Sequence, residues 1–181
     1  MLNVTLIRTQ VIYPALNKMG MWSEAAGELV LGTAIVESNL TYLKQHGDGP
    51  ALGLWQVEPA THEDLYANYL NYRPEMMSSL MELRSPALNM NENLATNLMY
   101  GAAVYRLCYY RKPDPLPEAG DVEGQGLFGR NITTRGWAKE RFQNMSSRFS
   151  KLSKKRVSKP RDPSWRLRRA LGHRVEPNPK A

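Results

Sequence analysis

A carboxylate closes an apolar helical pattern in the first quarter of this chain. Residues 24–37 read EAAGELVLGTAIVE, with Leu29, Val30, Ala34 and Ile35 on one side and Glu37 at the end. Burial and the negative end of the helix dipole both favour the protonated form of a carboxyl at such a position. A carboxyl that is protonated near neutral pH can act as the general acid at a glycosidic oxygen. A solvated surface glutamate is the alternative, and the spacing alone does not decide between them.

A glycine-rich loop and a short turn follow this helix. Residues 45–54 read QHGDGPALGL, which is typical of a loop that presents backbone N–H and C=O groups to a ligand. Trp55 would offer an apolar wall, and Gln56 an amide that both donates and accepts hydrogen bonds. An acid, an apolar wall and an amide together suit a sugar polymer as ligand.

Other residues with reactive side chains lie in or beside this region. Asp48 and Glu58 are candidates for a second carboxylate, which would favour hydrolysis by water. We expect His62 to lie on the surface at the start of a helix, outside the catalytic site. Cys108 should be buried and unreactive on an apolar helix face. A single cysteine allows no internal disulfide and no cysteine-based zinc site, and nothing implies a metal or cofactor.

Helical spacing dominates the chain and predicts an all-α protein. Ser23 should cap the helix over 24–37. Five further helices are expected, over residues 4–19, 61–71, 74–83 and 91–111 and from Asp121 onward. Pro14 should end or kink the first of them, and Gly20 should stop it.

Two of these helices carry a more specific expectation. A capping box of Thr61 and Asp64 should begin the helix over 61–71, and Asn91 or Asn93 should begin the helix over 91–111. We expect this long helix to run through the centre of the domain, with Glu37 facing a cleft beside Gln56.

The charge divides the chain into two parts. Residues 1–128 carry eight Lys and Arg against fourteen Asp and Glu, a net charge of −6, whereas residues 129–181 carry sixteen against three, a net +13. We therefore expect one domain over 1–128 and a basic, disordered tail over 129–181. The N-terminal residues show no signal-peptide pattern, and no stretch approaches the roughly 18 apolar residues of a membrane span.

The segments Glu37-Ser38 and Gly53-Leu54-Trp55-Gln56-Val57-x-Pro59-Ala60-Thr61 resemble the first two motifs of the soluble lytic transglycosylases. That family shares the lysozyme-like fold with goose-type lysozyme. The sequence resembles still more closely a group of small phage and prophage proteins that carry a GLWQxEPATH form and a PLPxAGDVEG stretch, which is seen here at 115–124. A third element is matched more loosely by Asn93-Leu94 and by Gly101-Ala102-Ala103-Val104-Tyr105. The resemblance covers about residues 10–128.

The resemblance implies peptidoglycan glycan strands as substrate and Glu37 as the single general acid/base. Glu37 would protonate the oxygen between N-acetylmuramic acid and N-acetylglucosamine, then take a proton from the muramoyl C6 hydroxyl as a 1,6-anhydro ring closes. Ser38 would orient Glu37 or contact the substrate. The turn from Gly53 through Trp55 to Gln56 would line the sugar site, and Tyr105 would fix the carboxyl by a hydrogen bond. The protein would be made in the host cytoplasm, associate with virion proteins and act at the cell wall.

The chain departs from the family pattern after Phe128. The related phage proteins continue with a segment such as Trp-Lys-x-Tyr-Tyr-Asn-Thr, which supplies a Tyr-Asn motif, whereas residues 128–141 read FGRNITTRGWAKER. With suitable synonymous codons, reading from the third base of the Phe128 codon gives Trp-Lys-Lys-Tyr-Tyr-Asn-Thr-Arg-Leu-Gly-Lys-Gly-Thr-Val. We therefore hypothesise that residues from about Gly129 onward are a frame-shifted segment. The nucleotide sequence tests this, since the other frame must continue with Tyr-Asn.

Two alternatives remain open at this point. The basic residues of 151–169 could form a genuine tail that binds nucleic acid, an anionic wall polymer or a lipid surface. The domain could also be a non-catalytic virion or wall-binding protein that keeps the fold, because the missing Tyr-Asn motif would remove one wall of the site.

Overall fold

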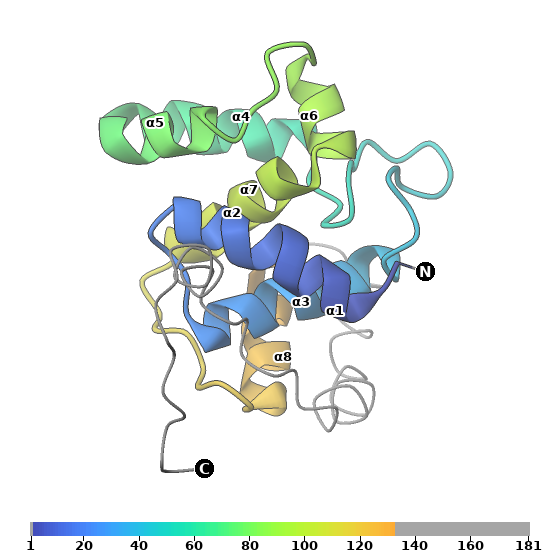
Figure 1. The fold of residues 1–181 in the computed structure, drawn as a ribbon, viewed down its shortest axis with the longest axis vertical. Helices are drawn as coiled ribbons and strands as arrows, with labels where there is room; N and C mark the ends of the chain where they lie inside the picture. Colours follow the sequence, from blue (N-terminus) through green and yellow to red (C-terminus); the bar gives the residue numbers. More distant parts are fainter. Residues whose placement is uncertain (1, 133–181) are drawn as a thin grey trace, which may run out of the picture.

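The computed structural model describes residues 2–132, and these residues are mostly helical with no strand among them (Figure 1). The all-α class expected from the spacing is confirmed for this part of the chain. The expectations for the basic tail concern residues outside it, except that residues 129–132 form the end of the last helix.

The first helical segment changes from π-helical to α-helical hydrogen bonding next to a proline. It consists of α1 (Val4–Leu6), a π-helical stretch η1 (Ile7–Ile12) and α2 (Tyr13–Lys18), with Pro14 in the first turn of α2. Pro14 has no N–H for the preceding turn, and the wider π turn before it accommodates that loss. The segment therefore passes through Pro14, and it ends at Gly20 with a φ of 66°.

Helix α3 (Glu24–Ser38) forms as the sequence predicts. The Ser23 side chain accepts a hydrogen bond from the Ala26 N–H at 3.0 Å, which caps the helix. Twelve of its fifteen residues are buried, so α3 is surrounded by protein on nearly every side.

The next helices are α4 (Pro59–Asn68), the 3₁₀ turn η2 (Leu70–Tyr72) and α5 (Pro74–Met81). The expected capping box of Thr61 and Asp64 is wrong, because α4 begins two residues earlier with Pro59 in its first turn. Asp64 instead accepts hydrogen bonds from Asn68 at 2.8 Å and from Arg111 at 2.5 Å.

The expected long helix is two helices, α6 (Met90–Thr96) and α7 (Leu98–Tyr110). The chain breaks at Asn97, where ψ is 92° and the side chain accepts from the Tyr100 N–H to cap α7. Helix α6 begins at neither predicted asparagine: Asn89 and Glu92 form a capping box there. Helix α7 packs against η1, α2, α3, α4 and α5, so the central helix is shorter than the sequence suggests.

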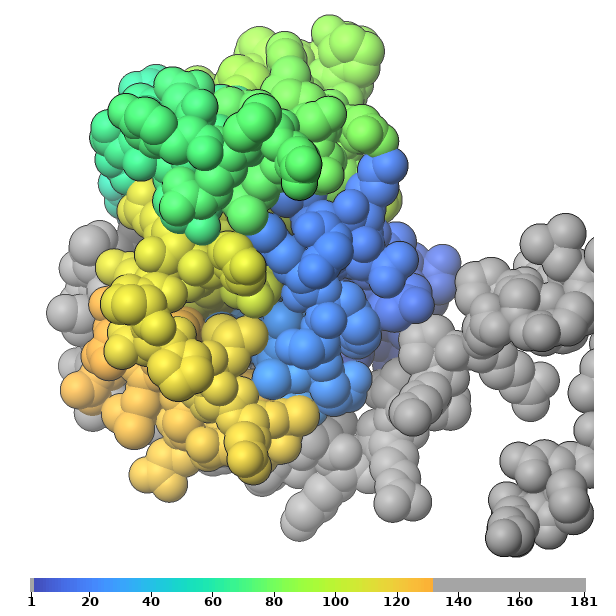
Figure 2. Space-filling view, turned by 90° about the vertical axis from the view of Figure 1, so that its left-hand side faces the viewer, coloured from blue at the N-terminus to red at the C-terminus, as the bar shows by residue number. Residues whose placement is uncertain are grey.

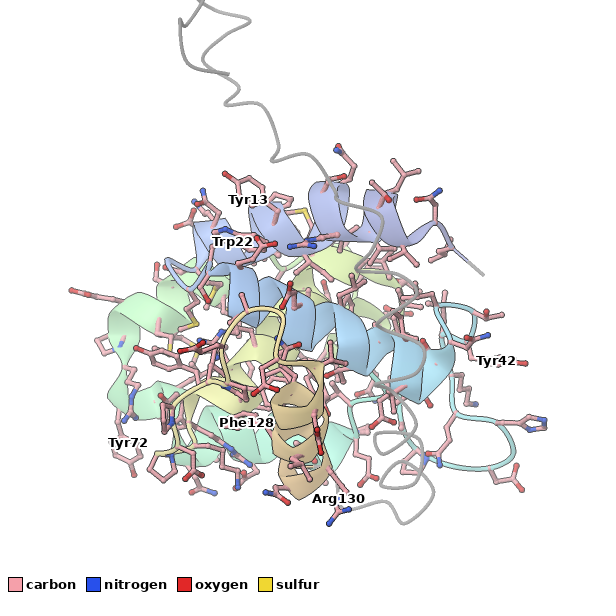
Figure 3. The ribbon with its side chains drawn as sticks, turned by 90° about the horizontal axis from the view of Figure 1, so that it is seen from below. Tyr13, Trp22, Tyr42, Tyr72, Phe128 and Arg130 are labelled. Atoms are coloured by element: carbon pink, nitrogen blue, oxygen red, sulfur yellow. The ribbon has the colours of Figure 1, made fainter. Side chains whose placement is uncertain are left out.

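The last helix, α8 (Val122–Ile132), packs against α3, and Glu28 of α3 makes a partly exposed polar contact with it and with the segment just before it. One carboxylate oxygen of Glu28 accepts hydrogen bonds from the Gly120 N–H at 2.7 Å and from the Gln125 amide at 2.8 Å. Phe128, which Figure 3 labels on α8, has its ring centroid 5.6 Å from that of Tyr109 on α7. The change of composition near residue 128 therefore falls inside α8.

Chain segments far apart in the sequence lie side by side in the assembled domain. Figure 2 shows the N-terminal helices directly against the segment that contains α7, with α4 and α5 above them. Among residues 2–132, no helix is both long enough and apolar enough to cross a membrane.

Candidate functional site

Glu37 and Ser38 are the last two residues of α3, and both are buried. Glu37 is 6% exposed and Ser38 1%. The Ser38 hydroxyl donates to the Ala34 carbonyl at 3.0 Å, so its single proton is directed back into the helix. For Ser38 to contact a substrate, this hydroxyl would have to turn away from Ala34.

The backbone on either side of the site adopts an uncommon conformation. Among the described residues, only three that are not glycine have a positive φ: Asn39 at 53°, Leu40 at 52° and Gln56 at 50°. Two directly follow the Glu37-Ser38 pair, and the third is the glutamine of the Gly-Leu-Trp-Gln turn. Asn39 is the C-cap of α3, where asparagine commonly adopts this conformation, whereas at Leu40 and Gln56 it costs about 1–3 kcal/mol each, and such positions concentrate at functional sites. The strained positions therefore coincide with the two sequence motifs.

Hydrogen bonds close the turn that carries Gln56. Leu52 and Val57 exchange backbone hydrogen bonds of 2.9 Å in both directions, and the Gln56 side-chain amide donates to the Gly53 carbonyl at 2.8 Å. Gly53 has a φ of 73°, and a Cβ at this position would lie 2.2 Å from the Leu94 carbonyl oxygen on α6. Only glycine fits there, so the backbone of the turn rests directly on α6.

Trp55 belongs to the core, which differs from the expected apolar wall. It is 1% exposed, and its indole N–H donates to the Val30 carbonyl of α3 at 2.9 Å. Its ring also packs near Gly101 on α7. In this conformation Trp55 offers no face to a sugar, and its role is to attach the turn to α3 and α7.

Glu37 shares its surroundings with Tyr105 and Tyr109 of α7. Burial is the main cause that raises the pKa of each phenol, and the charge of Glu37 raises both further. The two rings pack edge to face with centroids 5.1 Å apart. Tyr105 and Tyr109 therefore lie close enough to Glu37 for its charge to act on both phenols, and the expected hydrogen bond from Tyr105 to the Glu37 carboxyl stays a prediction.

Thr33 completes this cluster from the preceding turn of α3. Its hydroxyl donates to the Leu29 carbonyl at 2.8 Å and lies 2.5 Å from the Tyr109 hydroxyl. Neither Thr33 nor Tyr109 belongs to a motif. Thr33 lies four residues before Glu37, and Tyr109 lies four residues after Tyr105. Because residues four apart share a helix face, this spacing is the signal in the sequence that could have identified them.

His62 is buried, so the expected surface position is wrong. It is 3% exposed, its Nε2 lies 2.7 Å from the Tyr100 hydroxyl, and the Tyr66 hydroxyl lies 2.9 Å from that of Tyr100. Burial lowers the pKa of His62 to about 4. Cys108 is buried as predicted, and burial raises the pKa of its thiol to about 11.

The two candidates for a second carboxylate lie in different environments. Asp48 is exposed in the loop after α3, and Glu58 is half-buried directly before α4. A role for either beside Glu37 stays a prediction. Within residues 2–132, no group of three or more His, Cys, Asp and Glu side chains could hold a metal ion.

Asn93, which belongs to the loosely matched third element, is a fully buried structural residue. Its amide nitrogen donates to the carbonyls of Ser85, Leu88 and Asn89, each at 3.0 Å. Its oxygen accepts from the Ser85 N–H at 2.9 Å. Asn93 thus attaches the loop before α6 to that helix.

Comparisons of this chain with protein-family models, with curated proteins and with solved structures found no match. The candidate site therefore stands on the geometry described above.

Proposed function

We propose that this chain is a peptidoglycan-cleaving enzyme of the lytic transglycosylase type with a lysozyme-like fold. The observation that carries the proposal is the position of Glu37, a buried carboxyl at the C-terminal end of α3, directly before the left-handed residues Asn39 and Leu40. A buried carboxyl is expensive to keep ionised, and strained backbone persists where the surrounding structure enforces it.

In the proposed reaction, Glu37 acts first as an acid and then as a base. Its proton passes to the glycosidic oxygen between N-acetylmuramic acid and N-acetylglucosamine, and the bond from this oxygen to muramoyl C1 breaks. The carboxylate then takes the proton of the muramoyl C6 hydroxyl, whose oxygen bonds to C1 and closes the 1,6-anhydro ring. Gln56 would contact the adjacent sugar, and Tyr105 would hold the carboxyl in place.

A non-catalytic wall-binding or virion protein is the second candidate. The observation in its favour is the burial of the site: Glu37 is 6% and Gln56 5% exposed, and Trp55 is closed into the core. At these exposures a glycan strand has little access to Glu37, Gln56 or Trp55 in this conformation. Binding of nucleic acid through the basic tail concerns residues outside the described range.

Digestion of purified peptidoglycan, with mass spectrometry of the released products, tests the proposal. We expect 1,6-anhydromuramoyl products that disappear in Glu37→Gln, an isosteric change that removes the proton donor. Asp48→Asn and Glu58→Gln are matched controls. Glu37-dependent products with reducing ends would instead indicate a lysozyme, and dependence on either control would identify a second carboxylate.

If this chain releases no products, the next step is to repeat the digestion with a version whose reading frame is changed after Phe128. That version would carry the Tyr-Asn motif. Activity in that version would identify the chain as an altered copy of an enzyme. If neither version releases products but both still bind peptidoglycan, the proposed enzymatic function is contradicted and the wall-binding candidate is favoured.

A further inference from the structure

Tyr42 is an exposed aromatic residue in the loop between the two motifs of the candidate site. Because Trp55 is buried in the core, another side chain must supply any aromatic face at these motifs. Among the exposed large hydrophobic side chains of residues 2–132, three are aromatic: those of Tyr42, Tyr72 and Tyr110. Tyr42 follows Ser38 by four residues, it is 54% exposed, and Figure 3 shows it projecting outward from the loop after α3.

Backbone hydrogen bonds fix the position of Tyr42 relative to both motifs. The Tyr42 N–H donates to the carbonyl of Ser38, the last residue of α3, at 3.3 Å. The carbonyl of the next residue, Leu43, accepts from the N–H of Gly53 at 2.9 Å, and Gly53 is the first residue of the Gly-Leu-Trp-Gln turn. The backbone around Tyr42 is therefore attached to both motifs, whereas its side chain is open to solvent.

The rest of the loop is closed by further hydrogen bonds. Lys44 and Leu52 form an antiparallel bridge, the Gln45 N–H donates to the Ala51 carbonyl at 2.9 Å, and the Ala51 N–H donates to the Gln45 side-chain oxygen at 3.2 Å. A loop that is ordered before a ligand arrives loses less conformational entropy on binding.

We propose that Tyr42 is a substrate-contact residue whose ring stacks on a pyranose ring of the peptidoglycan glycan strand. The face of a sugar ring that carries C–H groups is apolar, and a tyrosine combines an apolar ring with a hydroxyl that stays hydrated. The inference rests on the proposed function in taking a glycan strand as the ligand, and it adds a residue that neither motif contains. Its test measures binding, so it does not require cleavage.

The test is isothermal titration calorimetry with glycan strands whose stem peptides have been removed by an amidase. Every chain in this series carries Glu37→Gln, so that no strand is cleaved during the titration. We expect Tyr42→Ala to raise the dissociation constant about tenfold, as for the loss of an aromatic contact at a binding surface. Tyr42→Phe keeps the ring and should bind within about twofold of the Glu37→Gln chain.

Tyr72→Ala is the matched control. Tyr72 is 74% exposed but belongs to η2, and Figure 3 shows it at the opposite edge of the view from Tyr42, so its removal should leave the dissociation constant unchanged. Thermal unfolding midpoints should agree among the variants, because both side chains are exposed.

Three results would overturn the inference. The first is a dissociation constant of Tyr42→Ala within about twofold of the Glu37→Gln chain. The second is an equal loss in Tyr42→Phe, which would assign the contact to the hydroxyl, and the third is the absence of measurable strand binding by the Glu37→Gln chain.

Binding and cleavage are distinguishable in this design. If Tyr42→Ala weakens binding while the chain with Glu37 intact releases no products, the Tyr42 contact stands and the proposed cleavage fails. If products appear and Tyr42→Ala changes neither binding nor their rate of release, the cleavage stands and the Tyr42 contact fails.

Discussion

The indole N–H of Trp55 donates to the Val30 carbonyl oxygen at 2.9 Å, and this bond joins the Gly-Leu-Trp-Gln turn to the middle of α3. Both motifs of the candidate site are therefore tied to the same helix, one through the chain itself and one through a tryptophan. The distance between Glu37 and the turn depends on this attachment.

Trp55→Phe should destabilise the domain by about 2–3 kcal/mol, since it removes a buried hydrogen bond and leaves a small cavity. Urea unfolding measures the loss. Trp22→Phe is the matched control, because Trp22 is only half-buried and packs edge-on against Tyr13 (Figure 3). A loss at position 55 no larger than at position 22 would contradict the structural role of Trp55.

Gly53→Ala should cost about 3 kcal/mol, and Gly20→Ala about 1 kcal/mol. Both glycines have similar positive φ values, 73° and 66°, but a Cβ at Gly20 would meet no atom within 4 Å, whereas one at Gly53 would lie against the Leu94 carbonyl. The difference between the two unfolding free energies isolates the steric contact. Equal costs would mean that the turn does not rest on α6.

Acid should destabilise the domain through His62. The pKa of His62 is lowered to about 4 in the folded state, whereas an unfolded histidine titrates near about 6.5, so the unfolded state binds the proton first. The contribution of His62 to stability is complete above about pH 6.5, and it declines as the pH falls, by about 3 kcal/mol once the pH is below about 4.

Urea unfolding at several pH values between 7 and 4 measures this dependence. Titration of other groups adds to it, so the useful quantity is the difference between wild type and His62→Leu. His46→Leu, at an exposed position, is the control. A pH dependence that is the same in wild type and His62→Leu would refute the assignment.

Asn93→Ala should destabilise the domain by about 2 kcal/mol, because it removes a buried amide and leaves several partly buried backbone groups of residues 85–89 without this partner. Asn91→Ala, at an exposed position of the same helix, should change stability by less than about 0.5 kcal/mol. Thermal unfolding of the two variants compares them directly, and similar melting temperatures would argue against the buried network.

Features determined by neighbouring residues could be predicted from the sequence, and features determined by distant contacts could not. Ser23 and the helix after it form as expected, because a capping side chain and apolar spacing act locally. The break at Asn97 was missed because apolar spacing continues through it, although the Asn97 cap is a local signal.

The surroundings of the candidate site show the same limit. Glu37, Gln56 and Tyr105 were recognisable from motifs, but the burial of Trp55 and His62 depends on α3 and α7, which the sequence does not place beside them. Thr33 and Tyr109 lie 76 positions apart, and no spacing rule connects them.

The left-handed backbone at Gln56 has a steric cost, and the proposed contact of Gln56 with the substrate would be a reason to keep a glutamine there. Glycine adopts this conformation without steric cost, so selection for a stable fold alone would favour glycine there. Part of the cost is offset by the bond from the Gln56 amide to the Gly53 carbonyl, which glycine could not make. Laboratory evolution for heat resistance should therefore replace Gln56 readily, whereas evolution that also demands activity on peptidoglycan should retain it.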